Sequence, residues 1–434
     1  MKIRNIFYLL ITILLLNACS SRVDIVEPKI ITDDKIEEGI IDDAFTQRKI
    51  ITKDHRLKVA TILPLTGQNA KIGQAMLNAI NLSLFDNDNK ERIELVIIDN
   101  KSSDYYSQKA IDEVIQKNIK IVIGPIFTNS VESIIEKAQE NNIIVLSFSN
   151  NSDLINKNNV FLAGFSPEQE IDRITSYLIE DGRNNFSVIA PNNQYGIRIV
   201  KTLREMVEMK DANFISSQFY LSDKKDFSKI ANNIVNSYIV SEEFEKNHRE
   251  ELDAIEDKEE REQKEVELVA KYKIYADTIL IAESSNKVFN IVKEIQRHNI
   301  DGRDIKIIGT SHWDKEELLE DISLYSAWFS GVDGKYYARF KEKYQQIYGT
   351  EPIRISSIAY DITAFVIDLA SELEGQNPHY ANIVNYNDKR GYRGIDGLFR
   401  FLPNGIIERN LSVIEINNQY FKTIDRAPRR FLRY

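Results

Sequence analysis

Cysteine is almost absent from this chain of 434 residues, in which Cys19 is the single one. No disulfide can therefore form within the chain, and a hydrophobic core has to hold the fold. The five histidines show no metal-ligand spacing, so no metal site is expected. An excess of positive charge is absent too. The formal net charge is −10, which argues against nucleic acid as a partner.

The signatures of catalysis and of cofactor binding are also missing. The stretch Gly309-Thr310-Ser311-His312-Trp313 lacks the second glycine of a nucleophile elbow. Gly391, Gly394 and Gly397 do not stand between a strand and a helix, as the glycines of a dinucleotide-binding loop do. The pair His312-Trp313 is more typical of a cleft rim or a core than of chemistry. We therefore expect a protein that is not an enzyme and that needs no cofactor.

A long hydrophobic run is missing, but a short one stands near the amino terminus. Lys2 and Arg4 precede an apolar run from Ile6 to Leu16, which has the length of a signal-peptide core and is too short to cross a bilayer as a helix. Leu16-Asn17-Ala18-Cys19 follows and resembles the bacterial lipobox. We expect residues 1–18 to be a lipoprotein signal peptide and Cys19 to carry the lipid. An ordinary secretory signal with an incidental cysteine is the alternative.

The expected place of the protein is the periplasmic face of the envelope. Ser20 follows the cysteine where an aspartate would suggest retention at the inner membrane, so the resemblance favours the outer membrane. Residues 19–54 carry acidic pairs and no helical or strand period. Such a segment cannot bury enough surface to fold, so we expect a tether between the anchor and the folded body.

The remaining chain is longer than one hydrophobic core usually serves, so two lobes are expected. Strands and helices alternate from residue 55 to residue 164, which predicts a first lobe with a parallel sheet. The alternation restarts after Ser166-Pro167-Glu168-Gln169, a capping box that opens a helix. We assign residues 165–309 to the second lobe, 310–385 to the completion of the first, 386–425 to the completion of the second, and 426–434 to a basic tail.

The segment 241–273 interrupts the second lobe. It is dense in glutamate and lysine, poor in apolar residues and without a sustained heptad pattern. A charged helix or helical hairpin is the predicted structure. Its exposed charge is either simply solvated or serves to dock a partner.

The stretch Lys120 to Ser130 predicts the edge where a ligand would bind. A β-branched strand ends at Gly124-Pro125, and Thr128, Asn129 and Ser130 open an amphipathic helix whose N-terminal N–H groups can hold a carboxylate. Alternatively, Asn129 only caps its own helix. Ligands of parallel sheets lie beyond the carboxyl ends of the strands. The other loops at these ends carry Thr66, Gly67, Ser147 and Ser149.

Four stretches, in the order KVATILPLTGQNAKIGQAMLNAI, KIVIGPIFTNS, VLSFSNNSDL and IAPNNQYG, resemble the type 1 periplasmic binding proteins of the leucine/isoleucine/valine-binding kind. The likeness extends over about Leu57 to Leu373 and implies two Rossmann-like lobes with parallel sheets around a hinged cleft. Two further stretches, IIGTSHWDKEELLED and GLFRFLPNGIIERNLSVIEI, resemble the penicillin-binding-protein activator lipoproteins.

The resemblance also implies which residues face a ligand. Hydroxyl and N–H groups near Thr128, Asn129, Ser147 and Ser149 would hold a carboxylate, and Tyr195 before Gly196 would close on the ligand. The acid that binds an ammonium group is missing from Gly164-Phe165-Ser166-Pro167, unless Glu168 serves, which makes free amino-acid binding doubtful. The expected ligand-binding residues are Thr66, Gly67, Thr128, Asn129, Ser130, Ser147, Ser149, Tyr195 and Trp313.

The resemblance leaves two functions open. The first is a regulator of peptidoglycan synthesis that contacts a penicillin-binding protein. The second is the substrate-binding receptor of an ABC transporter, whose partners are a permease and a small ligand in the cleft. In both cases the membrane is reached through the lipid anchor.

Overall fold

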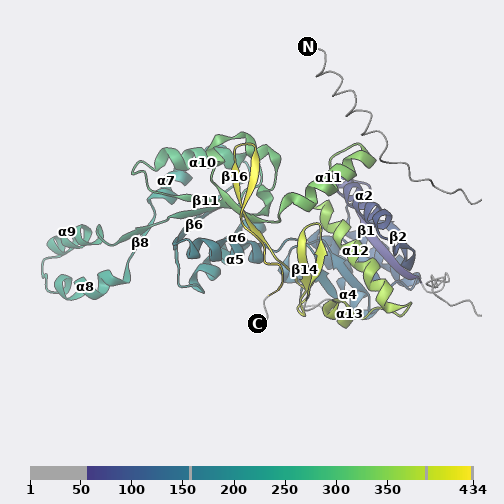
Figure 1. The fold of residues 1–434 in the computed structure, drawn as a ribbon. Helices are drawn as coiled ribbons and strands as arrows, with labels where there is room; N and C mark the ends of the chain where they lie inside the picture. The colour runs from purple at the N-terminus through teal and green to yellow at the C-terminus, as the bar shows by residue number, and fades with distance from the viewer. Residues whose placement is uncertain (1–55, 156–158, 387–389, 432–434) are drawn as a thin grey trace, which may run out of the picture. The chain divides into compact units, whose positions relative to one another are not determined.

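The computed structural model describes residues 56–155, 159–386 and 390–431. The expected signal peptide, Cys19, the tether and residues 432–434 of the expected basic tail lie outside these ranges. The described residues form two α/β lobes, each with its own mainly parallel sheet (Figure 1), which confirms the predicted fold class. Within these ranges, no helix has both the length and the apolar character to span a bilayer.

The first lobe contains a five-stranded parallel sheet in the order β2-β1-β3-β4-β5. The strands are β1 (Leu57–Leu63), β2 (Ile93–Asp99), β3 (Ile121–Ile123), β4 (Ile144–Ser147) and β5 (Val160–Leu162). The helices are α2 (Ala70–Asp86), α3 (Asp104–Gln116), α4 (Thr128–Glu140), α11 (Gly334–Tyr348), α12 (Ser356–Leu373) and α13 (Tyr380–Asn385), with short 3₁₀ turns η2 (Lys90–Arg92) and η3 (Ser152–Leu154).

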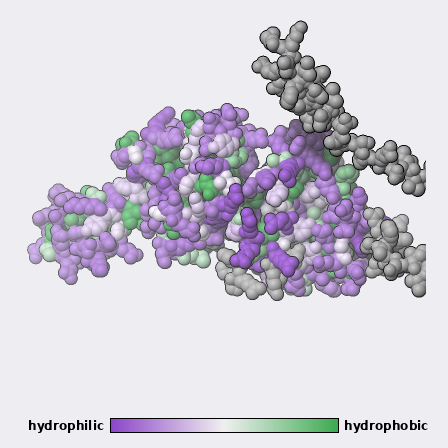
Figure 2. Space-filling view, viewed as in Figure 1, coloured by the Kyte–Doolittle hydropathy of each residue, from purple (hydrophilic) through white to green (hydrophobic). Residues whose placement is uncertain are grey.

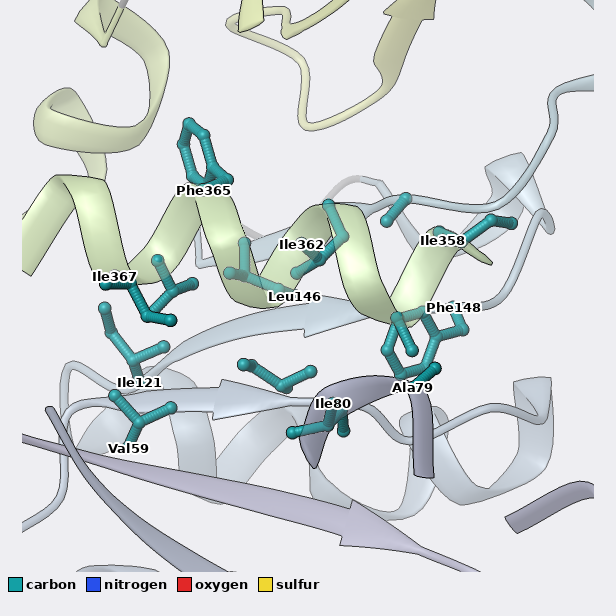
Figure 3. Packing of buried hydrophobic residues seen from close by; sticks show 14 of the residues in the cluster. Val59, Ala79, Ile80, Ile121, Leu146, Phe148, Ile358, Ile362, Phe365 and Ile367 are labelled. Carbon is teal, nitrogen blue, oxygen red and sulfur yellow. The ribbon is translucent and has the colours of Figure 1, made fainter. Parts of the chain in front are cut away.

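Successive side chains of the strands point to opposite sides of this sheet, and helices cover both of its faces. On one face Val59, Ile121 and Leu146 pack against α2 and α12 (Figure 3). The α12 residues Ile362 and Phe365 lie in that layer. The opposite face packs against α3 and α4. Helix α12 therefore returns to the first lobe from far along the chain.

The second lobe contains a seven-stranded sheet in the order β17-β16-β12-β11-β10-β6-β7. Five strands are parallel, and β16 and β17 add an antiparallel edge. The strands are β6 (Asn185–Pro191), β7 (Asn213–Tyr220), β10 (Thr278–Ile281), β11 (Lys306–Gly309), β12 (Trp328–Gly331), β16 (Ser412–Asn417) and β17 (Tyr420–Asp425). The helices are α5 (Pro167–Glu180), α6 (Gln194–Glu208), α7 (Ser228–Asn236) and α10 (Lys287–His298), with η4 (Ser311–Trp313), η5 (Glu316–Glu320) and η6 (Ile322–Leu324).

The chain passes between the lobes at three places, and two of them differ from the expected boundaries. The first crossover lies between β5 and α5, as expected. The second was expected near Gly309 but lies between β12 and α11, because Trp313, Leu318 and Phe329 pack in the core of the second lobe. Residues 310–333 therefore belong to the second lobe rather than to the completion of the first.

The third crossover lies between β15 (Ile407–Arg409) and β16, later than the expected position near Tyr386. Before it, β13 (Tyr392–Gly394), β14 (Gly397–Phe401) and β15 form a small antiparallel sheet. Phe399, Phe401 and Ile407 of this sheet pack into the core of the first lobe. The described part of 386–411 therefore completes the first lobe, and only β16 and β17 complete the second.

The charged segment forms the predicted helical hairpin. Helices α8 (Glu242–Asp253) and α9 (Lys258–Val269) lie between β8 (Tyr238–Val240) and β9 (Lys273–Tyr275). These two strands pair as an antiparallel ribbon that joins the helices to the second lobe (Figure 1). Phe244, Leu252 and Leu268 form a small core of the hairpin's own. The surface over the two helices is mostly hydrophilic (Figure 2).

Candidate functional site

A cavity of about 360 Å³ lies between the two lobes, and we call it the cleft cavity. The first lobe contributes Phe148 and Asn150 after β4, and Arg354 with Ile358 at the start of α12. The second lobe contributes the start of α5, Tyr195 on α6 and the loops after β10, β11 and β12. The cavity thus lies beyond the carboxyl ends of the parallel strands, where ligands of such sheets bind.

Tyr195 stands in the first turn of α6 and lines the cleft cavity. The helix is capped by Asn193, whose side-chain oxygen accepts the N–H of Gly196 at 2.9 Å. A Cβ at Gly196 would lie 1.9 Å from the carbonyl oxygen of Pro191, so only glycine fits after the tyrosine. The hydroxyl of Tyr195 lies 3.2 Å from that of Thr310. Burial raises the pKa of Tyr195, so its hydroxyl stays protonated.

Glu170 supplies a buried acid to the cleft cavity. Its carboxylate accepts hydrogen bonds from the backbone N–H of Ser311, at 3.1 Å, and from the Ser311 hydroxyl. Burial raises the pKa of Glu170 to about 7, against the effect of these two bonds. The sequence had pointed to Glu168 instead. Glu170 was recognisable, because it lies on the stripe of α5 that carries the buried Ile171 and Ile174.

Glu168 does not line the cleft cavity. Its carboxylate accepts from the hydroxyls of Ser166 and Ser152, at 2.6 and 3.3 Å, and lies 3.7 Å from Arg198. Ser166 also accepts from the backbone N–H of Gln169, as the predicted helix start requires. Arg198 in turn donates to the side chains of Asn150 and Asn151 in the first lobe. We call Arg198, Glu168, Asn150, Asn151 and Ser152 the α6 bridge, because they join the two lobes.

Arg354, Asp314 and Lys315 also line the cavity, and the sequence did not reveal them. The guanidinium of Arg354 donates to Asp314 at 2.6 Å and to Asp396 at 2.9 Å. Burial disfavours its charge, but Asp396 and Asp314 outweigh this effect and raise the pKa of Arg354. Asp314 belongs to the second lobe, so this ion pair also joins the lobes. With both carboxylates in contact, Arg354 is already neutralised inside the protein.

The hydroxyl residues of the expected carboxylate site lie together, and their hydrogen bonds join the loop after β3 to the loop after β4. The Thr128 and Ser149 hydroxyls are 3.1 Å apart, and Ser147 donates to the Pro125 carbonyl and accepts from the N–H of Ser149. None of the three lines the cleft cavity. Thr128 instead lines an adjacent groove of about 650 Å³ beside Tyr195 and the α6 bridge.

Helix α4 begins at Thr128, as the sequence predicted, but the alternative role of Asn129 as its cap is wrong. Phe127 is the N-cap, and no side chain caps the helix, so Asn129 does not have the capping role. Asn129 is exposed, whereas Ser130 is buried and donates to Asp104 at 3.4 Å. Neither residue lines the cleft cavity.

Three other expected residues also lie away from the cleft cavity. Thr66 and Gly67 are exposed between β1 and α2, and the Thr66 hydroxyl donates to Asp99 at 2.6 Å. Trp313 is fully buried in the second lobe, where its indole N–H donates to the carbonyl of Glu283 at 2.9 Å. The neighbouring His312 lines the cavity instead, with its ring 5.1 Å from that of Tyr195. No cluster of potential metal ligands occurs among the described residues.

The two lobes, their sheets and the cavity between them define a binding protein of the periplasmic class. The family model for periplasmic binding proteins matches residues 56–420, so the chain belongs to this family. A solved structure of a putative branched-chain amino acid ABC transporter protein from Rhodospirillum rubrum is similar, with a TM-score of 0.67 and 15% identity over 85% of this chain and 100% of that one. The leucine-binding protein LivK from Thermotoga maritima gives 0.56 and 16%, over 85% and 97%.

Curated relatives match a smaller part of the chain. An uncharacterised protein of Rickettsia prowazekii is 26% identical over 181 residues, which is 42% of this chain and 48% of that protein. The penicillin-binding protein activator LpoA of Vibrio cholerae is 27% identical over 178 residues, which is 40% of this chain and 29% of the activator. The match therefore spans less than half the length of each of these relatives.

Proposed function

We propose that this protein is a regulatory lipoprotein that activates a penicillin-binding protein in peptidoglycan synthesis. The state of the cleft is the observation that carries the proposal. Arg354 is neutralised by Asp314 and Asp396, and the hydroxyls of Thr128, Ser147 and Ser149 bond to one another or to the backbone of the neighbouring loop. A free amino acid needs unoccupied partners for its carboxylate, and these groups do not offer them. The similarity to the activator of Vibrio cholerae supports the same function.

The ion pair and the α6 bridge support this proposal from another direction. A receptor closes because its ligand provides contacts that join the lobes. Here Arg354–Asp314 and Arg198–Asn151 supply such contacts from the protein itself. The lobes can thus present a defined surface to a protein partner without a small molecule. In this proposal the protein is not an enzyme and needs no cofactor.

The proposed location is the periplasmic face of the outer membrane, with Cys19 as the lipidated residue and residues 19–54 as the tether. The multiple acyl chains of a lipoprotein cysteine would make the anchor effectively permanent. The chain's net charge of −10 supports a protein partner rather than nucleic acid.

Capture from envelope extract tests the activator function. The full chain is compared with a variant that lacks 242–271, in which Ser241 and Tyr272 are replaced by Asn-Gly. These two residues already lie opposite each other, with the N–H of Ser241 bonded to the carbonyl of Tyr272 at 3.0 Å, so they can form a two-residue hairpin turn. We expect the full chain to recover a penicillin-binding protein, detected with fluorescent penicillin, and the shortened chain to recover less.

The outcomes separate the protein's function from the role of the hairpin. Failure of both chains to recover a penicillin-binding protein would end the activator proposal. Equal recovery by both would keep the activator and remove α8 and α9 from the interface. Thermal unfolding of the shortened chain is the control, because the hairpin has a core of its own and its loss should leave the body folded.

The second candidate is the substrate-binding receptor of an ABC transporter. Glu170 and Tyr195 favour it, because an acid and an aromatic ring face one cavity of suitable size for a small ligand. If Thr66, Gly67, Asn129, Ser130 or the neighbouring hydroxyls bind a ligand, their loops must first rearrange. Recovery of a permease instead of a penicillin-binding protein in the same experiment would favour this function.

A further inference from the structure

A second cavity, of about 440 Å³, lies within the first lobe and shares no lining residue with the cleft cavity. Helices α2, α11 and α12 and the strand β13 with its following turn surround it. Its lining includes three cations, Arg339, Lys343 and Arg393, and two of its aromatic residues are Tyr336 and Phe340. We call it the α11 cavity.

The α11 residues of this cavity follow a helical stripe. Tyr336, Arg339, Phe340 and Lys343 are spaced so that they share one face of the helix. Such a stripe is usually apolar where a helix packs on a core. Here two of its four members are cations that face a cavity. The stripe therefore does not serve core packing alone.

The carboxylates that line the α11 cavity are already engaged. Asp86 accepts from Lys343 and, at 3.0 Å, from the hydroxyl of Tyr360. Asp361 is buried, and its oxygens accept the backbone N–H groups of Ile395 and Asp396 at 2.6 and 3.0 Å. The ion pair between Asp86 and Lys343 thus also neutralises the charge of Lys343.

Arg339 and Arg393 are the other two cations that line the α11 cavity. Arg339 on α11 and Arg393 on β13 are exposed, and within the described ranges neither has a carboxylate partner. They reach the same cavity from different elements. Tyr336 beside them is 47% exposed, so its ring is accessible to a bound molecule. An arginine side chain presents a planar set of donors that fits the oxygens of a carboxylate or a phosphate.

We propose that the α11 cavity binds a small oxyanion, a carboxylate or phosphate compound, between Arg339 and Arg393, with its organic part against Tyr336. The site is separate from the cleft and independent of the proposed function. Free phosphate and a carboxylic acid offer the same chemistry to two arginines, so the test uses both.

The test is calorimetric titration of the full chain, purified in detergent, with inorganic phosphate and with citrate at constant ionic strength set by chloride. The pocket variant carries Arg339→Gln and Arg393→Gln. The matched control carries Arg249→Gln and Arg426→Gln, which remove the same charge at two exposed arginines outside the cavity. We expect the unmodified chain to bind at least one anion, the pocket variant to bind it at least tenfold more weakly, and the control to change less than twofold.

Three results would contradict the proposed oxyanion site in the α11 cavity. The first is the absence of binding of either anion by the unmodified chain. The second is unchanged binding by the pocket variant. The third is an equal loss in the control, which would mean that the anions respond to overall charge only. Binding of phosphate alone or of citrate alone would support the site and identify its preferred oxyanion. Thermal unfolding of the pocket variant should match that of the unmodified chain, because both arginines are exposed.

Discussion

Single buried charges decide what the cleft cavity can bind. Arg354 has its charge matched by two aspartates from different parts of the chain, whereas Glu170 has only the hydrogen bonds of Ser311. A carboxylate without a cationic partner in an apolar environment resists ionisation. Glu170 is therefore the group in the cavity whose charge changes most readily near neutral pH.

The pH dependence of stability follows from Glu170. Its pKa rises from the usual 4.5 to about 7 in the folded protein, so between these values the folded state keeps a proton that the unfolded chain has lost. The free energy of unfolding therefore falls as the pH rises through this window and levels off above it. Glu170→Gln keeps the neutral form at every pH. We expect this variant to lose that contribution and to be more stable at pH 8 by up to roughly 3 kcal/mol.

Urea unfolding at pH 5 and pH 8 measures this difference. Glu168→Gln is the matched control, because Glu168 lies on the same turn and remains partly exposed beside Arg198. The control should keep most of the pH dependence of the unmodified protein, because burial raises the pKa of Glu170 more than the nearby charge of Glu168 does. If Glu170→Gln keeps that dependence too, Glu170 is ionised in the folded state and the argument fails.

Most of the strands and helices were predictable from the sequence, but the lobe to which some of them belong was not. The helical spacing of apolar residues located α2 to α4, and runs of Ile, Val and Leu located β1 to β4. The strand β12 was missed, since its four residues, Trp-Phe-Ser-Gly, include no β-branched residue. Without β12, residues 310–333 had no sheet to join and were assigned to the other lobe. The small β13–β15 sheet packs on the first lobe, which the local antiparallel pairing of its strands does not reveal.

The candidate site was predictable where it depends on local sequence. Asn193 and Gly196 fix the helix start that places Tyr195 at the cavity, and these residues are adjacent in the chain. Arg354 was not predictable, because its partners Asp314 and Asp396 lie about forty residues away on either side. The hydroxyl loops were located, but their hydrogen bonds depend on how β3 and β4 pair, which the loop sequence alone does not specify.

The α6 bridge connects α6 of the second lobe to the loop after β4 of the first lobe. Arg198 on α6 donates to Asn150 and Asn151 in the loop after β4, so its removal should let the lobes separate further. We expect Arg198→Ala to increase the radius of gyration measured by small-angle X-ray scattering. The two lost hydrogen bonds should lower the free energy of unfolding by about 1–3 kcal/mol.

Lys201→Ala is the control for this bridge. Lys201 lies one turn further along α6 and is exposed, and its ion pair among the described residues is with Glu205 of the same helix at 3.8 Å. It should leave both the scattering curve and the stability unchanged. Superimposable scattering curves for Arg198→Ala and the unmodified chain would show that the bridge does not hold the lobes together.

At the scale of the whole molecule, the carboxyl-terminal segment links the lobes once more. After β17 in the second lobe, the carbonyl of Pro428 accepts from the side chain of Asn410 at 2.8 Å. Phe431 is buried, and its ring lies 4.4 Å from the guanidinium carbon of Arg400 on β14 in the first lobe. The expected basic tail is therefore fixed as far as Phe431. Its exposed Arg429 and Arg430 stand at a defined place on the surface.

The proposed lipid anchor at Cys19 would decide where in the cell envelope the whole molecule acts. If Cys19 carries the lipid, Cys19→Ser should move the protein from the membrane pellet to the soluble periplasmic fraction, as seen by fractionation and immunoblot. The physical reason is that several acyl chains together bind a bilayer almost irreversibly, and the variant has none. Ser20→Ala should remain in the outer membrane, whereas Ser20→Asp should shift to the inner membrane. Persistence of Cys19→Ser in the pellet would contradict the lipoprotein proposal, and recovery of the unmodified chain in the soluble fraction would favour an ordinary secretory signal instead.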